Sequence, residues 1–504
     1  MFKTEEIHNL HLEAYEPPEL STELSVKNFL LFSKLDDEVC AFVSEKYLVD
    51  ATNYYTKLKS IYPLHMLDED SYDRLYNRFL ELRTDKTMES MQEDSSDENE
   101  EDISLSDFLR TSSDILTSEE SAPIINFVNA LFYQAIKKRA SDIHIEVQEK
   151  RGEVRFRVDG MLIKNADLDK KVVNLIVSRI KVISNLDISE KRIPQDGRTQ
   201  IKISGETLDV RVSVLPTFYG ERVVMRLLMQ SSQIPQINEL GFDNTLIDDI
   251  KKLLRLSHGI ILVTGPTGSG KTTSLHSFLR EVEEPQKNLL TVEDPVEYKS
   301  DNISQIQVNE KVGLTFSAAL RSILRQDPDV IMIGEIRDEE TAAIAVRAAL
   351  TGHLVFSTLH TNSAAATISR LADMGVEPFL ISSSLLGILA QRLVRVLCDE
   401  CKEEDSVAEE FADDYNLKEG TKIYKACGCR ACGYSGYVGR QSIGELLIMD
   451  DYVKELLKST TDEHTIKTAL EKNGLKTISF GLQELLLSGK TSLDEAIRVG
   501  LGHG

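Results

Sequence analysis

The stretch HGIILVTGPTGSGKTT, residues 258–273, decides the fold of this chain. Its first part, residues 259–264, is a short apolar run that predicts a buried strand of a parallel sheet. The residues that follow, GPTGSGKT, match the phosphate-loop pattern G-x-x-x-x-G-K-[ST] at every position. A chance match is expected about once in fifty chains of this length, and seldom between a strand and a helix. The sequence therefore predicts a phosphate-binding loop.

Each residue type in this loop has a chemical task. Glycines let the backbone wrap so that its N–H groups point inward at phosphates. Lys271 is expected to reach the β- and γ-phosphates and Thr272 to offer its hydroxyl to Mg²⁺, while the following helix adds the positive end of its dipole. ATP and Mg²⁺ are the predicted ligands. The predicted nucleotide-binding residues are Gly265, Pro266, Thr267, Gly268, Ser269, Gly270, Lys271, Thr272 and Thr273.

Composition narrows the class of protein. The 504 residues leave room for roughly three or four domains. No run of 18 apolar residues exists, and the acidic N-terminus lacks the apolar core of a signal peptide. A net charge of −24 weighs against binding to nucleic-acid phosphates. We therefore expect a cytoplasmic protein that reaches a membrane only through a partner.

Two further apolar runs end in acidic residues. LLTVEDPVEY at 289–298 contains Glu293 and Asp294, and VIMIGEIRD at 330–338 contains Glu335. An apolar strand followed by an acid is typical of a Walker B element, which holds the metal or orients the attacking water. Glu335 is therefore the predicted catalytic base. Gly334 stands where most P-loop enzymes carry aspartate, which leaves the metal-side acid open between Asp294 and Glu293.

Histidines and arginines supply further candidates for the catalytic site. His353 and His360 bracket a third apolar run, where they are suited to sensing the γ-phosphate, although a lone histidine there is more often structural. Upstream of the phosphate loop, Arg211 and Arg226, with Arg198 as a weaker candidate, lie on predicted strands and turns. Each arginine alone is typical of a solvated strand position. Together they can supply cations to a nucleotide held between two domains or subunits.

Five of the six cysteines crowd into one short region. Cys398-x-x-Cys401 and Cys429-x-x-Cys432 form two knuckles separated by 27 residues, the spacing of a tetrahedral Zn²⁺ site. With four thiolates the site is closed, so its role is structural. Cys427 breaks the pairing and is the natural control. Cys40 lies far away in the sequence, and no role is assigned to it.

The chain divides into six predicted segments. Residues 1–85 carry a small α/β pattern, with strands at 26–32 and 38–44 joined by a turn at 34–37, and helices at 48–60 and 71–82. Residues 86–118 are a predicted linker, because the stretch from Glu89 to Asp102 holds eight acidic residues and no basic ones, which is typical of a solvated segment; partner binding is the alternative. An α+β domain at 119–232, a nucleotide-binding core at 240–395, a cysteine-rich subdomain at 396–440 and a helical region at 441–504 follow.

Taken together, the motifs resemble the secretion ATPase superfamily, the hexameric P-loop motors of type II secretion, type IV pilus assembly and retraction, and type IV secretion. TVEDPVEY at 291–298 resembles its aspartate box, IMIGEIRD at 331–338 its atypical Walker B element, and TGHLVFSTLHTN at 351–362 its histidine box. ASDIHIE at 140–146, RFRVDG at 155–160 and PQDGR at 194–198 resemble the domain that precedes the motor core. The resemblance covers about residues 120–504.

Within the superfamily, MGVEPFL at 374–380, a following helix at 382–386 and QRLVR at 391–395 are most similar to the type II secretion ATPases. The resemblance implies an α/β fold, in which a RecA-like P-loop NTPase core is preceded by an α+β domain and accompanied by a tetracysteine zinc subdomain and a small N-terminal α/β domain. It further implies a homohexamer that hydrolyses ATP to drive pseudopilus assembly and protein export. Residues 1–85 would dock on the cytoplasmic domain of an inner-membrane secretion protein, and a membrane platform protein would be a second partner.

Three alternative functions remain open at this stage. A type IV pilus assembly ATPase is the nearest, because it shares the four-cysteine insertion. A nucleic-acid translocase on a RecA-like core is disfavoured by the net charge of −24 and the lack of a basic stripe, so no nucleic-acid partner is expected. A nucleotide-gated scaffold with slow turnover is disfavoured by the complete set of acidic and histidine motifs.

Overall fold

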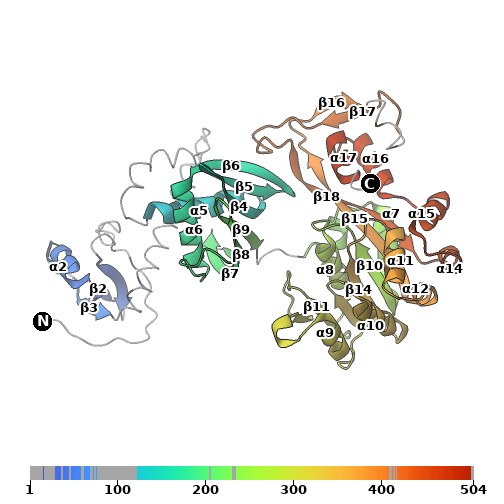
Figure 1. Ribbon diagram of the computed structural model, residues 1–504, viewed down its shortest axis with the longest axis horizontal. Coiled ribbons are helices and arrows are strands. Elements are labelled where there is room, and N and C mark those ends of the chain that lie inside the picture. Colours follow the sequence, from blue (N-terminus) through green and yellow to red (C-terminus); the bar gives the residue numbers. More distant parts are fainter. Residues whose placement is uncertain are drawn as a thin grey trace. The chain divides into compact units, whose positions relative to one another are not determined.

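The structure, a computed structural model, describes residues 29–35, 38–44, 47–57, 62–67, 122–203, 206–229, 234–407 and 417–500, with the single residues 15, 17, 72, 75, 411 and 415. These residues form two compact units: one reaches to Phe156 and includes Leu162–Leu227, and the other holds Arg157–Met161 and the chain from Leu228 (Figure 1). The predicted linker at 86–118 lies outside the described residues. So does the predicted helix at 71–82, apart from Tyr72 and Leu75.

The first described part is a small α/β sheet. Strand β1 (Leu31–Leu35) pairs antiparallel with β2 (Glu38–Ser44), and β2 pairs parallel with β3 (Leu64–Leu67) after helix α2 (Leu48–Lys57). Side chains from β1, β2, β3 and α2, together with Tyr72 and Leu75, form its apolar core. The second predicted strand is confirmed. The first lies later than predicted, because Lys34 and Leu35, expected in the turn, pair with Val39 and Glu38 in the ladder.

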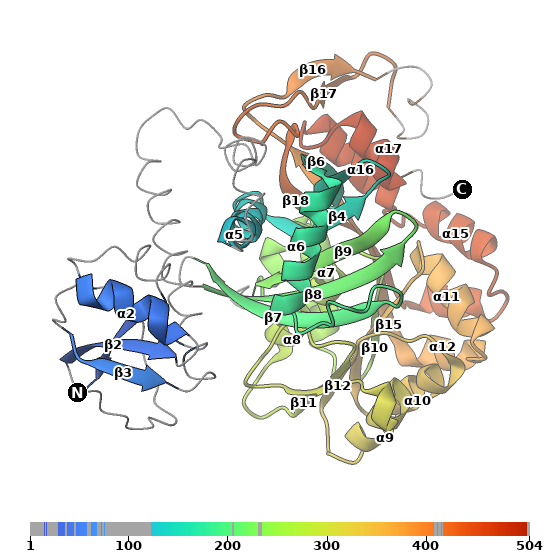
Figure 2. The ribbon, with the colours of Figure 1, turned by 60° about the vertical axis from the view of Figure 1, so that its left-hand side comes forward.

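An antiparallel sheet with two helices follows. Helix α5 (Ala122–Lys137) precedes strands β4 (Ala140–Val147), β5 (Arg151–Val158) and β6 (Met161–Asp169), and helix α6 (Lys170–Ile183) precedes β7 (Gln195–Ile203), β8 (Glu206–Thr217) and β9 (Gly220–Met229). The strand order is β6-β5-β4-β9-β8-β7. Helices α5 and α6 lie side by side and both pack on β4 (Figure 2). Alternation along β5 buries Val154 and Phe156 and leaves Arg155 less buried, as the sequence pattern predicts.

A seven-stranded sheet of order β12-β11-β13-β14-β10-β15-β18 forms the centre of the second unit. Six strands are parallel, and β18 runs antiparallel to β15. Fully buried runs of apolar residues are typical of parallel sheets that helices cover on both faces. The strands are β10 (Gly259–Thr264), β11 (Leu289–Glu293), β12 (Ser304–Gln307), β13 (Val330–Ile333), β14 (Leu354–Leu359), β15 (Leu385–Leu397) and β18 (Tyr437–Ile448).

Alternating side chains of this sheet belong to two cores. Ile260 and Leu262 face a core shared with helices α9 (Phe316–Ile323), α10 (Glu339–Leu350), α11 (Ala364–Asp373) and α12 (Pro378–Ser384). Ile261 and Val263 face the opposite core, shared with helices α7 (Asn244–Leu254) and α8 (Lys271–Val282) and with the short helix η3 (Ile237–Glu239). The short helix η4 (Glu310–Val312) precedes α9. The predicted RecA-like α/β core is confirmed, with the phosphate loop at the carboxyl edge of β10.

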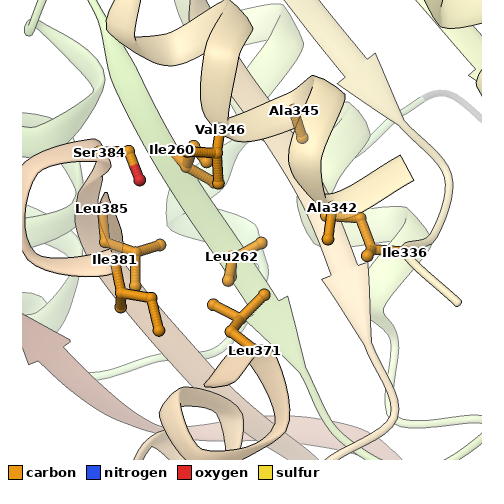
Figure 3. A pocket seen from close by; sticks show the side chains of 10 residues that line it. All are labelled: Ile260, Leu262, Ile336, Ala342, Ala345, Val346, Leu371, Ile381, Ser384 and Leu385. Carbon is orange, nitrogen blue, oxygen red and sulfur yellow. The ribbon is translucent and has the colours of Figure 1, made fainter. Parts of the chain in front are cut away.

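One small apolar cavity of about 10 Å³ remains in the first of these cores, beside β10 (Figure 3). Figure 3 shows that the side chains around it come from β10, α10, α11, α12, the start of β15 and the turn after β13. The cavity is large enough for about one water molecule, so it offers no room for a ligand. Its lining residues are Ile260, Leu262, Ile336, Ala342, Ala345, Val346, Leu371, Ile381, Ser384 and Leu385.

The last part of the chain leaves the sheet through β15 and returns to it through β18. Between them lie the cysteine-rich turns and the antiparallel pair β16 (Glu403–Ser406) and β17 (Lys422–Lys425). Helices α14 (Asp451–Leu457), α15 (Glu463–Lys472), α16 (Ile478–Leu487) and α17 (Leu493–Gly500) complete the chain. Among the described helices, none combines the length and apolar character needed to cross a bilayer.

Candidate nucleotide and metal sites

The phosphate loop joins the buried strand β10 to helix α8. Gly268 and Gly270 have φ of +81° and +87°, a left-handed conformation that glycine adopts without strain. The Lys271 ammonium turns back into the loop, where its Nζ donates to the carbonyl oxygens of Gly265 (2.8 Å) and Pro266 (3.1 Å). Burial lowers the pKa of Lys271 to about 8, with the charge of Glu335 acting in the opposite direction. Lys271 and Glu335, 64 residues apart in the sequence, thus belong to one electrostatic site.

Glu335 follows strand β13 at the same carboxyl edge of the sheet. Its carboxylate forms an ion pair with Arg337 and lies 3.4 Å from Nε2 of His360. The pairing raises the pKa of Arg337. Gly334 packs tightly against β11, because a Cβ there would lie 3.2 Å from the carbonyl oxygen of Val292. This close approach leaves little room for the Cβ that an aspartate would place before Glu335.

The two acids of the aspartate box face in different directions. Glu293 is buried, and its carboxylate accepts hydrogen bonds from Thr291 Oγ1 (2.6 Å) and Gln305 Nε2 (3.1 Å), while its other oxygen lies 3.1 Å from His276 Nε2. Asp294 is exposed, and its charge helps to raise the pKa of Arg337 beside Glu335. The geometry therefore favours Asp294 over Glu293 as the acid at the metal side.

The two predicted histidines lie at opposite ends of β14. His360 follows the strand and contacts Glu335. His353 precedes the strand, where its Nδ1 lies 2.8 Å from the carbonyl oxygen of Ala348 at the end of α10. Six strand residues separate the two ends, a length of about 20 Å. His353 therefore lies at the other end of the strand from Glu335, at the end of helix α10, whereas His360 adjoins the predicted catalytic base.

The candidate arginines gather on one side of the antiparallel sheet. Arg198 on β7 lies opposite Arg211 on β8 in the ladder, and Nε of Arg226 on β9 donates to Asp142 at 3.1 Å. These arginines line an open hollow of about 400 Å³ together with Asp196. The hollow lies entirely within the first compact unit, which has no phosphate loop of its own.

The four predicted metal ligands come together at the end of β15. All four sulfur atoms of Cys398, Cys401, Cys429 and Cys432 lie within 4.8 Å of one another, and three of the pairs are 3.8 Å apart. In a tetrahedral site with Zn–S bonds of about 2.3 Å, sulfur atoms are about 3.8 Å apart. The donor set therefore fits zinc. Cys427 is exposed and is not part of the group.

Backbone N–H groups prepare this site for a charged thiolate. The N–H of Gly428 donates to Cys401 Sγ at 3.2 Å, and those of Cys429 and Gly436 donate to Cys432 Sγ at 3.1 and 3.2 Å. Burial raises the pKa of the Cys432 thiol, but the backbone donors of Cys429 and Gly436 and the thiols of Cys429 and Cys401 outweigh it and lower the pKa to about 6. Backbone donors on a cysteine sulfur favour the thiolate, the form in which cysteine binds metal.

Two groups in the nucleotide site were not predicted from the sequence. Arg337 pairs with Glu335, and its place two residues further along the chain is the signal that could have indicated it. Gln391 contacts the back of the phosphate loop from β15. No local pattern indicates that contact, because 122 residues separate Gln391 from its partner Ser269.

Comparison with known proteins identifies the family of this chain. The family described as Type II/IV secretion system protein matches residues 117–498. The type II secretion system ATPase E of Vibrio cholerae is 50% identical over 411 residues, which cover 81% of this chain and 82% of that protein. The type II secretion system protein E of Klebsiella pneumoniae is 49% identical over 402 residues, covering 80% and 81% of the two chains.

Solved structures share the fold. The ATPase DotB of Legionella pneumophila superposes with a TM-score of 0.55 at 23% identity, over 75% of this chain and 95% of that one. The DotB of Yersinia pseudotuberculosis gives a TM-score of 0.56, also at 23% identity, over 76% and 95% of the two chains. With the family match over most of its length, the chain belongs to the type II/IV secretion system proteins, as an ATP-hydrolysing motor of the type II secretion branch.

Proposed function

We propose that this chain works as a homohexameric ATPase that drives pseudopilus assembly and protein export through a type II secretion system. The observation that carries the proposal is that Lys271 and Glu335 follow β10 and β13, parallel strands whose carboxyl ends share one edge of the sheet, with His360 and Arg337 on the Glu335 carboxylate. A type IV pilus assembly ATPase would use the same site. The secretion branch is favoured because the relatives described above carry that name.

The residues of the site divide the chemistry among them. Lys271 exchanges the carbonyl oxygens of its own loop for the β- and γ-phosphates of ATP. Glu335 accepts a hydrogen bond from the attacking water and polarises it toward the γ-phosphorus. Mg²⁺, when bound, neutralises phosphate charge, and the Thr272 hydroxyl and Asp294 are the groups that would hold it.

Arginines from the other unit complete the site in this proposal. Arg211 and Arg226 line a hollow together with Arg198, Asp142 and Asp196, in a unit that holds no phosphate loop. Closure of domains or subunits would bring them to the phosphates, where such cations stabilise transition-state charge. Turnover should then rise steeply with protein concentration, and Arg211→Ala or Arg226→Ala should remove that rise. Full activity in an isolated monomer would contradict this step.

Location and partners follow from the same proposal. The segment 1–85 docks on the cytoplasmic domain of an inner-membrane secretion protein, which keeps the motor at the cytoplasmic face of that membrane. A secretion platform protein of the membrane receives the mechanical stroke, and nucleic acid plays no part. Residues 396–440 hold a structural Zn²⁺ through the four cysteines. The six segments proposed from the sequence keep their boundaries in this proposal.

Two variants test the catalytic assignment. Lys271→Ala should abolish ATP binding, because the phosphates lose their main cation. Glu335→Gln should bind ATP and lose turnover by roughly 100-fold or more, the scale for a positioned catalytic group. Both variants are measured by binding of a fluorescent ATP analogue, by phosphate release, and by restoration of export in cells that lack the chain. Near wild-type turnover in Glu335→Gln would contradict the assignment of Glu335 as the catalytic base. Export in cells whose variant does not hydrolyse ATP would contradict the proposed motor function.

A further inference from the structure

The back of the phosphate loop rests on strand β15 through one side chain. Gln391 is fully buried and lies next to Ala390, which pairs with Thr264 at the end of β10. Its Nε2 donates to the carbonyl oxygen of Ser269 at 2.7 Å, and its Oε1 accepts a hydrogen bond from the Ser274 hydroxyl at 2.8 Å. One amide thus joins the loop to the helix that follows it.

This contact determines which way one peptide unit of the loop points. The peptide between Ser269 and Gly270 is planar and trans, so its carbonyl and its N–H point in opposite directions. Because Gln391 holds the carbonyl toward β15, the N–H of Gly270 is turned toward the open side of the loop, where backbone N–H groups cradle phosphates. Gly270 has a φ of +87° and no side chain, so an unanchored peptide here could flip at little cost.

Ser274 fixes the orientation of Gln391 itself. A side-chain amide presents a donor on one side and an acceptor on the other, and only the donor suits the carbonyl of Ser269. The Ser274 hydroxyl is buried and donates to Oε1, which leaves Nε2 facing the loop. Ser274 is in turn held by its backbone N–H, which donates to the carbonyl oxygen of Gly270 at 3.0 Å. Gln391, Ser269, Gly270 and Ser274 thus form a closed set of contacts behind the loop.

We propose that Gln391 is a positioning residue of the ATP site, which presets the phosphate loop through the carbonyl of Ser269, and that Ser274 orients it. This inference rests on the assignment of the phosphate loop as the nucleotide site. ATP and ADP both carry the phosphates that the loop N–H groups contact. Gln391 therefore contributes equally to the binding of both nucleotides and does not act on the attacking water.

The test replaces the amide by an apolar group of similar length. In the full-length chain, Gln391→Met should weaken binding of fluorescent ATP and ADP analogues about tenfold each, the scale for one buried hydrogen bond. The KM for ATP should rise by the same factor, while kcat at saturating ATP stays within about twofold of wild type. Gln441→Met is the matched control. It removes a glutamine of the neighbouring strand β18 whose Nε2 donates to Gly241 at 2.9 Å, and should leave both affinities unchanged.

A second variant keeps the inference falsifiable if Gln391→Met does not fold. Ser274→Ala leaves the glutamine in place but removes its orienting donor, and should weaken ATP and ADP binding about threefold. The proposal is overturned if folded Gln391→Met binds both nucleotides as tightly as wild type, or if it loses kcat with an unchanged KM. If only Ser274→Ala folds, wild-type affinities in that variant overturn it. Lys271→Ala separates the two levels of failure. If Lys271→Ala still binds ATP, the assignment of the loop as the nucleotide site is wrong. If Lys271→Ala loses binding while Gln391→Met and Ser274→Ala keep wild-type affinity, only the role of Gln391 is wrong.

Discussion

The pKa of Lys271 makes ATP binding depend on pH in a direction that can be worked out. ATP needs the charged ammonium, and in the empty site burial lowers the pKa of this group to about 8. Affinity is therefore full well below pH 8 and falls as pH rises through 8, because binding must then recruit a proton. The protonated fraction falls from about nine tenths at pH 7 to about one tenth at pH 9, so ATP should bind about tenfold more weakly, or about 1.4 kcal/mol.

The assay is an equilibrium titration of the full-length chain with a non-hydrolysable fluorescent ATP analogue and Mg²⁺ at half-unit steps between pH 7 and 9. Lys271→Arg is the control, since a guanidinium keeps its charge over this range. Its affinity should be lower than that of wild type, because the fork does not fit the site of an ammonium, but flat with pH. A flat wild-type profile, or the same fall in Lys271→Arg, would refute the reasoning.

Two further predictions follow from the geometry. His360→Gln should lower turnover at least tenfold, because His360 contacts Glu335. His353→Gln should change stability more than kcat, because His353 caps a helix. Phosphate release and thermal unfolding of both variants check this prediction, and an equal loss of kcat in the two variants would contradict it. Val346→Ile adds one methylene beside the small cavity of Figure 3 and should raise the free energy of unfolding by up to about 0.8 kcal/mol. Thermal unfolding should show a higher midpoint temperature for Val346→Ile and a lower one for Val346→Ala.

Local sequence patterns were sufficient where neighbouring residues determine the structure. The strand at 259–264 and its loop were predicted residue by residue, because an apolar run, glycines and a lysine in one stretch leave few alternatives. The grouping of the four cysteines followed from spacing in the same way. The predicted helix at 382–386 was less accurate. Helix α12 ends at Ser384, and Leu385 already begins β15, where Gly387 allows Leu253 to pack against the strand.

Contacts between distant segments were beyond such patterns. Glu293 and Asp294 are adjacent acids of the same type, and only the packing of α8 and β12 against β11 shows that Glu293 is buried in a hydrogen-bond network. Strand β18 joins the central sheet beside β15, although the pattern from residue 441 onward indicated helices. In both cases the residues that bury Glu293 or pair with β18 belong to elements distant in the sequence, so a local pattern cannot indicate these contacts.

The contacts along β15 predict that loss of the metal stays local. The strand carries Gln391 at the phosphate loop and ends one residue before Cys398. Between them, Arg395 binds the buried carboxylate of Glu495 through its guanidinium at 2.8 and 3.0 Å and stacks on Tyr437 at 3.9 Å. These contacts hold the strand whether or not zinc is bound.

Cys429→Ser should therefore lose the single zinc ion per chain that the four sulfurs fit, and its cysteine-rich turns should become sensitive to protease. Its ATP affinity should stay within about twofold of wild type, because Arg395 and Glu495 separate the two sites along the strand. Cys427→Ser, whose thiol is exposed and outside the cluster, should keep both the zinc and the protease resistance. Elemental analysis of protein purified under reducing, chelator-free conditions measures the metal, and fluorescence titration measures the affinity. A large fall in ATP affinity that accompanies zinc loss would show that β15 transmits disorder past Arg395, contrary to what its contacts imply.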